Sequence, residues 1–379
     1  MKLLHLISDD KFIDSHIRKF SWEGFQNVFL YLKETSTYAG KNSHLITHIR
    51  PLSKSYNDYI DLSQEFDGIV TNGLGYYQSM FINRLPATSR IFWCFFGAEI
   101  YNNPKIWNSS DLYGPRTKRV LARNWGYFFL RSLYHLRFYF KYRTSMHSEI
   151  KKAIVRCDYF LWYIKEEYDL IKSKSDIVLP EFRPLPITDR VADSQISYRK
   201  RDEILLGNSG SEANNHIDLL KLLGENSCVY KIKLPVSYGL KNWYKKEMIK
   251  TLHKSKLKVD FMESFVPYTE YIQNFTHAKA AIYPSYRQMG LGNIILCILN
   301  GVKIYLSERN PVFQWLKNIG VKVFTIEKCL KIDLKYDNFA LDSETILENK
   351  LAWNKLISTQ NENQFRELFS SLLISPNNE

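Results

Sequence analysis

The sequence predicts an α/β protein made of two halves, each built around a largely parallel sheet. Two observations carry this prediction. Short, almost continuous apolar runs alternate with helical or loop segments, a pattern typical of strands buried on both faces of a parallel sheet. The series of runs begins again after a polar break, and 379 residues is about the length of two ordinary domains.

The apolar runs place the expected strands along the chain. In the first half they are residues 1–8, 27–32, 68–71 and 90–96, and in the second half they are 203–206, 229–234, 258–261, 280–283, 302–306 and 321–324. Residues 181–202 contain two prolines and many charged side chains, which is typical of a linker. We therefore expect an N-terminal domain (1–185), a C-terminal domain (186–345) and helices (346–379) that pack back toward the N-terminal domain. Ligands of such sheets bind beyond the carboxyl ends of strands, so we expect the site in a cleft between the two domains.

Composition excludes several classes of protein. Apolar residues make up 45% and charged residues 24% of the chain, so neither a disordered nor a fibrous protein is expected. No run approaches the roughly 20 apolar residues that span a bilayer, and the N-terminal apolar run is too short and too soon acidic for a secretory signal. The five cysteines form no CxxC pair, so we expect buried thiols, no metal site and a reducing, cytoplasmic compartment.

A turn of small residues follows the strand expected at 203–206. It contains Gly207, Asn208, Ser209 and Gly210, and a helix is expected from about His216. Glycines let backbone N–H groups approach a ligand, and the free N–H groups at a helix start favour an anion such as a diphosphate. The alternative is a tight turn in which Ser or Asn caps the helix.

A second turn of the same character follows the strand expected at 280–283. It presents Arg287, Gln288, Gly290, Gly292 and Asn293 before an apolar helix. The guanidinium fork of an arginine pairs well with phosphate. The spacing fits neither a P-loop nor a dinucleotide fingerprint, and the alternative is a close helix–strand contact beside a surface arginine.

Carboxylates follow two strands of the first half. Glu99 comes just after the strand expected at 90–96, and Asp9 and Asp10 come after the first strand. A carboxylate at such a position is suited to act as a general base that faces the cleft, although capping of a helix is an equal alternative. His5 lies on an apolar strand and is expected to be a hydrogen-bonded core residue.

Residues 116–152 hold ten basic side chains and one carboxylate, interleaved with aromatic residues. Most of the net charge of +13 therefore lies in this segment. Cations alternating with rings favour the headgroup layer of an anionic membrane; a single-stranded nucleic acid and a plain solvated helix are the weaker alternatives. The residues expected to contact the membrane are Arg119, Arg123, Trp125, Arg131, Arg137 and Lys141.

Five motifs occur together in one order along the chain. They are FWCFFGAEIY (92–101), ILLGNSGSEANNHIDLL (204–220), LPVSYG (234–239), RQMGLGN (287–293) and ERNPVFQ (308–314). Together they resemble glycosyltransferase family 56, whose members transfer 4-acetamido-4,6-dideoxygalactose (Fuc4NAc) from a dTDP-sugar to a lipid-linked saccharide of enterobacterial common antigen. The resemblance is clear over 204–320 and patchy before that.

The resemblance implies a GT-B fold, in which two Rossmann-like domains face each other across a cleft. It also implies a metal-independent enzyme without a cofactor, peripheral to the cytoplasmic face of the bacterial inner membrane. Its partners would be a nucleotide sugar held by the second domain and a polyprenyl diphosphate-linked saccharide held by the first, with no nucleic acid. Glu99 stands where the family has the aspartate of a GADLY-like motif.

The candidate site residues take these roles. Glu99 is the first and Asp10 the second candidate for the base, and Arg287 offsets the charge of the leaving diphosphate. The donor-binding candidates are Gly207, Asn208, Ser209, Gly210, His216, Tyr238, Gln288, Gly290, Gly292, Asn293 and Glu308. The rival functions are a fucosyl- or hexosaminyltransferase of a capsule or O-antigen pathway, and a non-catalytic protein that binds membrane or nucleic acid.

Overall fold

The computed structural model describes residues 1–34, 38–187 and 202–374; for Trp125, 127–132, Tyr134 and Tyr268 it describes the backbone alone. The chain divides into two compact units, each with its own sheet. Unit 1 contains Met1–Ser109, Arg131–Asp189 and Gln360–Glu379, and unit 2 contains Ser110–Leu130 and Arg190–Thr359.

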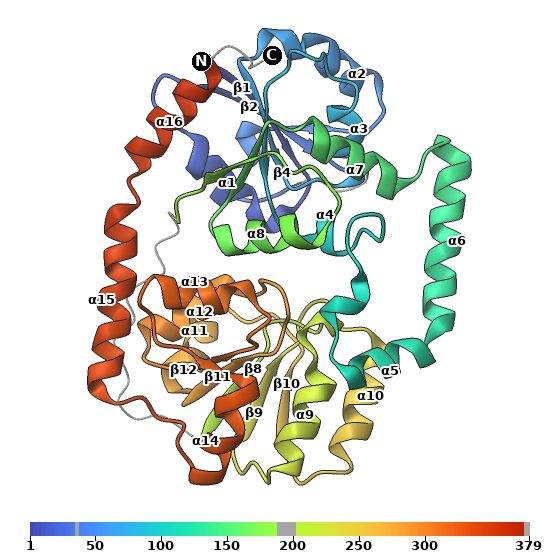
Figure 1. Ribbon diagram of the computed structural model, residues 1–379. Coiled ribbons are helices and arrows are strands. Elements are labelled where there is room, and N and C mark those ends of the chain that lie inside the picture. Colours follow the sequence, from blue (N-terminus) through green and yellow to red (C-terminus); the bar gives the residue numbers. More distant parts are fainter. Residues whose placement is uncertain (35–37, 188–201, 375–379) are drawn as a thin grey trace. The chain divides into compact units, whose positions relative to one another are not determined.

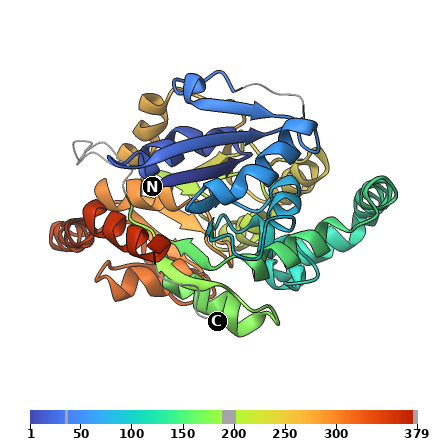
Figure 2. The same ribbon diagram turned by 90° about the horizontal axis from the view of Figure 1, so that it is seen from above.

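Unit 1 is built on a seven-stranded parallel sheet of order β3-β2-β1-β4-β5-β6-β7 (Figure 1 and Figure 2). Its strands are β1 (Lys2–Ile7), β2 (Gln26–Leu32), β3 (Ile46–Ile49), β4 (Gly68–Asn72), β5 (Ile91–Cys94), β6 (Tyr159–Trp162) and β7 (Glu181–Pro184). Its helices are α1 (Ile13–Phe20), α2 (Lys54–Asp61), α3 (Tyr76–Ile82), α4 (Ala98–Tyr101), α7 (Met146–Arg156), α8 (Lys165–Lys174) and α16 (Glu362–Ile374).

The C-terminal helix α16 completes the core of unit 1. Its Phe365 and Phe369 pack with Phe20 and Phe92, and the rings of Phe92 and Phe369 lie 4.2 Å apart between centroids. His5 of β1 is fully buried and hydrogen-bonded, as expected from its apolar strand. Burial lowers the pKa of His5 to about 4, although its hydrogen bond with Asn27 opposes that shift.

Unit 2 is built on a six-stranded parallel sheet of order β10-β9-β8-β11-β12-β13 (Figure 1). Its strands are β8 (Glu203–Leu206), β9 (Lys231–Pro235), β10 (Lys258–Met262), β11 (Ala280–Tyr283), β12 (Lys303–Leu306) and β13 (Phe324–Thr325). Its helices are α5 (Pro115–Arg123), α9 (His216–Glu225), α10 (Asn242–Leu252), α11 (Tyr268–His277), α12 (Leu291–Leu299), α13 (Pro311–Asn318), α14 (Lys331–Tyr336) and α15 (Ser343–Thr359). The helix α6 (Trp125–Tyr142) begins in unit 2 and continues in unit 1.

The expected strands are confirmed at nine of the ten apolar runs, since β1, β2, β4, β5, β8, β9, β10, β11 and β12 lie within or overlap them. The tenth run, 321–324, only touches β13. The strands β3, β6 and β7 were not expected, because ITHI is half exposed, YFLW follows a charged helix and EFRP looks like linker. All five cysteines are free, and four of them are buried as expected.

The prediction of a linker over residues 181–202 is wrong for its first residues. Glu181–Pro184 forms β7, which pairs with β6 at the edge of the sheet. An edge strand tolerates proline because the backbone amides on its outer side have no neighbouring strand to which they could donate a hydrogen bond. Residues 188–201 of the predicted linker lie outside the described part of the chain.

The units also differ from the expected domains at two places. Residues 110–130, expected in the N-terminal domain, belong to unit 2, because the N-terminus of α5 is hydrogen-bonded to Asp218 of α9. The expected C-terminal helical segment is divided, with α15 in unit 2 and α16 in unit 1. Across the residues that the structure describes, every helix is too short or too polar to cross a membrane.

Candidate active site

The two glycine turns lie against each other in unit 2. They follow β8 and β11, which are neighbouring parallel strands. The amide of Gly207 donates to the carbonyl of Ile282 at 2.8 Å, and a Cβ atom added to Gly290 would lie 2.7 Å from Cβ of Asn208. The structure therefore brings both turns together at the carboxyl ends of the strands, where ligands of such sheets bind.

The glycines of the first turn are required by the conformation and packing of the turn. Gly207 has φ +70°, a conformation that costs a residue with a side chain about 1–2 kcal/mol. A Cβ atom on Gly210 would lie 2.5 Å from Cα of Leu240, and its amide donates to the carbonyl of Tyr238 at 2.9 Å. The amides of Gly207 and Gly210 are thus used internally, which differs from the expectation that they face a ligand.

The two residues between these glycines are better placed for an anion. Asn208 and Ser209 are buried, and their amides donate to no other described residue. The side chain of Asn208 donates to the Tyr238 hydroxyl at 3.1 Å, and that of Asn214 donates to the Ser209 carbonyl at 2.9 Å. Asn214 therefore positions the turn, a role that sequence reasoning missed although the residue lies in the quoted motif.

His216 begins α9 and faces the first turn. It is fully buried, and a Cβ atom added to Gly207 would lie 2.9 Å from its Nε2 atom. Burial lowers the pKa of His216 to about 3, so the ring is neutral at physiological pH. Neither ring nitrogen has a hydrogen-bond partner among the described residues. A buried polar atom without a partner is costly, so a ligand or water is expected beside this ring.

The second turn presents the N-terminus of α12. Gly290 precedes the helix with φ +69°, and the first intrahelical bond is made by Ile294, whose amide donates to the Gly290 carbonyl at 3.0 Å. The three amides between them precede that ladder, and free N–H groups at a helix start favour an anion. Space beyond the Cα atom of Gly292 is open for at least 4 Å, and the Asn293 side chain donates to the Tyr271 hydroxyl at 2.9 Å.

Arg287 and Gln288 lie half-buried in the loop that joins β11 to α12. The hydroxyl of Ser285 donates to the carbonyl of Arg287 at 3.0 Å. Asn310 braces the same loop, because its side chain donates to the carbonyl and the hydroxyl of Ser285, each at 3.1 Å. Asn310 belongs to the ERNPVFQ motif, so this motif contributes a positioning residue that was not singled out from the sequence.

Tyr238 and Glu308 lie at the ends of other strands of the sheet. The ring of Tyr238 is 41% exposed and nearly parallel to that of Phe265, with centroids 6.4 Å apart. Glu308 follows β12, and its carboxylate pairs with Lys328 at 2.6 Å. Its amide donates to Glu327 at 3.1 Å. Tyr238 thus contacts the first turn through Asn208, whereas the Glu308 carboxylate is occupied by an ion pair.

Glu99 lies in unit 1, just beyond the carboxyl end of β5. Gly97 turns the chain there with φ +92°, and the Glu99 side chain is 5% exposed. Its Oε1 atom accepts hydrogen bonds from the Trp93 indole and the Phe96 amide, both at 3.0 Å. These bonds fix the orientation of the carboxylate.

Asp10 also lies in unit 1, after β1. Its Oδ1 atom accepts hydrogen bonds from the Tyr31 hydroxyl and from Lys33, the latter at 2.7 Å. Burial raises the pKa of Asp10, but the hydrogen bonds from Lys33 and Tyr31 outweigh it and leave the pKa below its ordinary value. A carboxylate held ionised in this way is a weaker proton acceptor.

The expected membrane residues fall into both units. Arg119 and Arg123 lie on α5 in unit 2, and Arg137 and Lys141 are exposed on the part of α6 that belongs to unit 1. The side chains of Trp125 and Arg131 lie outside the described part of the structure.

The unit 1 part of α6 has two apolar faces. Phe138 is buried against Tyr76, with ring centroids 4.0 Å apart. The side chains of Leu133, Leu136 and Phe140 are exposed, Phe140 by 61%. Their spacing of three and four residues places them on one stripe, on the side of the helix opposite Phe138.

No group of three or more His, Cys, Asp or Glu side chains that could hold a metal ion occurs within residues 1–34, 38–187 and 202–374. The groups that the two turns present are backbone amides, side-chain amides, a neutral imidazole and a guanidinium. Such a set suits an anionic ligand, and the diphosphate of a nucleotide is an anion of the right kind.

Solved structures with a similar fold include glycosyltransferases. Sucrose-phosphate synthase from Thermosynechococcus elongatus has 10% identity and a TM-score of 0.62, with 98% of this chain and 99% of that chain covered. A glycosyltransferase from Rickettsia africae ESF-5 has 10% identity and a TM-score of 0.60, with 99% of each chain covered. The E. coli trehalose-6-phosphate structure with UDP-2-fluoro glucose has 9% identity and a TM-score of 0.56, covering 99% of this chain and 100% of that one. At these identities they establish the fold, which is GT-B.

The family described as 4-alpha-L-fucosyltransferase glycosyl transferase group 56 matches residues 103–346, which is more than half of the chain. The match includes both glycine turns, Arg287 and the ERNPVFQ motif, whereas Asp10 and Glu99 precede it. It confirms the resemblance inferred from the ordered motifs. The chain therefore belongs to glycosyl transferase group 56 and is a glycosyltransferase with the GT-B fold.

Proposed function

We propose that this glycosyltransferase transfers a deoxy or deoxy-amino sugar, such as Fuc4NAc, from a dTDP-sugar to a saccharide carried on a polyprenyl diphosphate, without a metal ion. The observation that carries the proposal is the contact between the two glycine turns, which gathers ligand-directed groups from β8 and β11 at one place in unit 2.

The donor diphosphate would lie against these turns. The amides of Asn208 and Ser209 and those at the start of α12 are preorganised N–H donors, and each is available without breaking a bond to another described residue. His216 supplies a neutral ring nitrogen beside the first turn. Tyr238 is half exposed beside Asn208, which suits contact with the ribose or the base.

Arg287 would stabilise the leaving group. When the acceptor hydroxyl attacks the anomeric carbon, the bond to the nucleoside diphosphate breaks and negative charge grows on its phosphate oxygens. A guanidinium beside those oxygens stabilises the charge in the transition state more than in the bound donor, which is the condition for acceleration. The loop that Ser285 and Asn310 brace holds Arg287 for this task.

The proton of the acceptor hydroxyl would pass to a carboxylate of unit 1. Glu99 is our first candidate, because it is buried and oriented at the carboxyl end of β5. Asp10 is the second candidate, with a lowered pKa that counts against it.

The acceptor would be reached at the cytoplasmic face of the bacterial inner membrane. The exposed stripe of Leu133, Leu136 and Phe140 on α6, next to Arg137 and Lys141, combines apolar and basic groups on one helix. Such a helix lies in the interfacial layer of an anionic bilayer. This arrangement supports a peripheral enzyme that acts on a lipid-linked substrate.

The test is an Arg287→Ala variant assayed for nucleoside diphosphate release and, by mass spectrometry, for the glycosylated lipid. Loss of one charge-stabilising donor is expected to reduce turnover by about 10²–10³-fold, with an unchanged melting temperature. Arg287→Lys should recover part of the loss because it keeps the charge without the fork. Arg366→Ala on α16 is the matched control and should transfer sugar normally. Normal turnover by Arg287→Ala would refute the assignment.

The family name favours a second donor, an L-fucose nucleotide. Parallel assays of the purified protein with GDP-fucose, UDP-N-acetylhexosamines and dTDP-Fuc4NAc distinguish this donor from the proposed dTDP-sugar. Product from the dTDP-sugar alone supports our proposal, and product from GDP-fucose alone replaces it with fucosyl transfer.

A further inference from the structure

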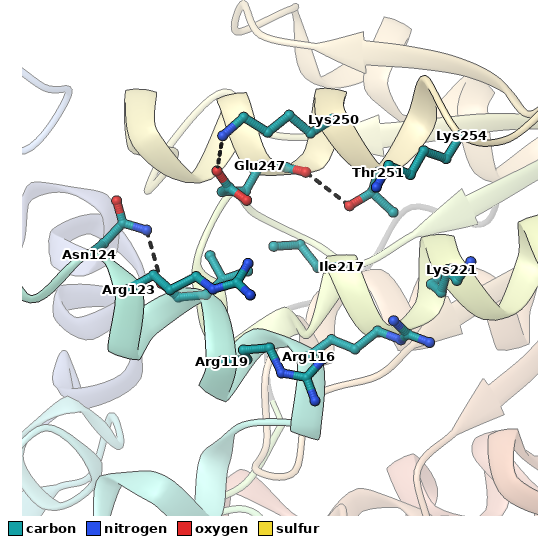
Figure 3. Close-up of a pocket in the computed structure, with 11 residues that line it drawn as sticks. Arg116, Arg119, Arg123, Asn124, Ile217, Lys221, Glu247, Lys250, Thr251 and Lys254 are labelled. Carbon is teal, nitrogen blue, oxygen red and sulfur yellow. Dashed lines mark hydrogen bonds and ion pairs between the residues drawn. The ribbon is translucent and has the colours of Figure 1, made fainter.

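A basic cavity lies in unit 2, and none of the residues of the two glycine turns lines it. It has a volume of about 620 Å³, opens to solvent and lies among α5, α9 and α10 (Figure 3). Six cationic side chains line it: Arg116, Arg119, Arg123, Lys221, Lys250 and Lys254. The proposed function uses none of these side chains in binding the donor or in transfer.

The charge of this cavity is only partly balanced. Glu247 is the one carboxylate that lines it, and it pairs with Lys250 at 2.5 Å. Arg116 and Lys221 both approach Glu225, at 3.5 and 3.2 Å.

The side chains of the remaining three cations, Arg119, Arg123 and Lys254, make no ion pair or hydrogen bond with any other described residue. Figure 3 shows the two arginines on α5 and the lysine just beyond α10 around the same hollow. Like charges brought together in this way repel each other unless an anion lies between them. The cavity is thus built for a ligand with negative charge.

The fold holds the arginines of α5 in place. Asp218 of α9 accepts hydrogen bonds from the amides of Arg116 and Thr117, at 2.8 and 2.9 Å, and from the Thr117 hydroxyl at 2.6 Å. The Asn215 side chain accepts from the amide of Gly114 at 2.8 Å, and a Cβ atom on Gly114 would lie 2.5 Å from the Asp218 carboxyl carbon. The start of α5 is therefore fixed on α9, and the cavity does not depend on a loose loop.

We infer that this cavity binds the phosphate group of an anionic phospholipid headgroup. The inference rests on the proposed function, because an enzyme whose acceptor is lipid-linked must work at a bilayer surface. Guanidinium forks suit phosphate oxygens, and all three unpaired cations are exposed, so a headgroup can reach them from outside. From Asn124, which also lines the cavity, the chain continues directly into α6, the helix that carries the exposed apolar stripe.

The experiment measures sedimentation of the full-length protein with vesicles of phosphatidylglycerol and phosphatidylcholine. The test variant is Arg119→Ala/Arg123→Ala/Lys254→Ala, which breaks no bond between described residues. At roughly fivefold per cation near an anionic surface, partitioning should fall on the order of 100-fold. The control, Lys258→Ala/Lys331→Ala/Lys335→Ala, removes the same amount of charge from exposed sites of unit 2 outside the cavity. Its partitioning onto the vesicles should fall only a few-fold.

Equal partitioning of the test and control variants would overturn the inference. A second arm uses inorganic pyrophosphate, without lipid, in a thermal-shift assay. If pyrophosphate stabilises the wild-type protein but not the test variant, while both bind vesicles alike, the cavity binds a soluble phosphate compound and the headgroup assignment is wrong.

A separate measurement distinguishes failure of the proposed function from failure of the headgroup site. Both triple variants keep Arg287 and the glycine turns, so their melting temperatures should rise with dTDP as in the wild type. Loss of vesicle binding with retained dTDP binding supports the headgroup site. Absence of dTDP binding in every variant and in the wild type counts against the proposed dTDP-sugar donor and leaves the vesicle result to decide the cavity.

Discussion

Replacing Gly290 by alanine tests the contact between the two glycine turns. Gly290 has φ +69°, and an L-residue in the left-handed region costs about 1–2 kcal/mol. Its new Cβ atom would lie 2.7 Å from Cβ of Asn208, whereas carbon atoms normally approach to about 3.5–4.0 Å. Because that neighbour is attached directly to the backbone, it must move by about 1 Å, and such overpacking costs about 1–3 kcal/mol. The free energy of unfolding should therefore fall by about 2–5 kcal/mol.

Gly292→Ala is the matched control two residues along the same turn. Open space surrounds its Cα atom and the residue lies in α12, so alanine should stabilise the helix by about 0.5–1 kcal/mol. Chemical denaturation of both variants, with tryptophan fluorescence as the signal, measures the difference, and calorimetric titration with dTDP measures binding. Gly290→Ala should also bind dTDP more weakly, because the turns are pushed apart. Equal stability of the two variants would show that the turns are not in contact.

Three further predictions concern the base, a buried histidine and the anchor of α5. Glu99→Gln keeps an oxygen to accept the bonds that orient the carboxylate but cannot take a proton, so turnover should fall by about 10²–10⁴-fold at an unchanged melting temperature; a loss found instead in Asp10→Asn moves the role to Asp10. His216, with its pKa lowered to about 3 by burial, stays neutral in the folded state while the unfolded chain takes up a proton near pH 6.5. The unfolded state therefore binds more protons, and this residue should lower the free energy of unfolding by up to about 1.4 kcal/mol per pH unit as pH falls from 6.5 toward 3. Chemical denaturation at pH 7 and pH 5 should show a smaller loss of unfolding free energy in His216→Gln than in the wild type. An equal loss in the two proteins would contradict the reasoning. Asp218→Ala removes the acceptor at the start of α5 and should cost about 1–2 kcal/mol, with faster hydrogen exchange over Pro115–Arg123; unchanged exchange there would mean that other contacts hold the helix.

Local patterns in the sequence predicted much of the fold. Runs such as 204–206 and 280–283 are apolar without interruption, and such runs form the central strands β8 and β11. The strand β7 was missed because Glu181–Pro184 is polar and ends in proline, and only its place at the edge of the sheet makes that composition acceptable. Edge strands carry the weakest signal because one side of their backbone pairs with nothing.

The candidate site was predicted as two separate turns. The glycines, Arg287 and Asn293 could be found from the sequence because close approach of the backbone and a guanidinium leave a recognisable residue pattern. The supporting contacts could not be found, since Asn214 and Asn310 act on residues whose positions depend on the folded chain. The same holds for Gly210, whose missing side chain makes room for Leu240 and not for a ligand.

The amino-acid sequence was enough to predict the α/β class, most strands, the ordered motifs of the family and the basic character of 116–152, because each depends on residues that are near one another along the chain. The folded chain was needed to establish that the two turns touch, that α5 belongs to unit 2 and that its arginines share a cavity with α9 and α10. Those features come from contacts between residues about 80 to 130 positions apart in the sequence, and no local pattern records which distant side chain will fill a given space.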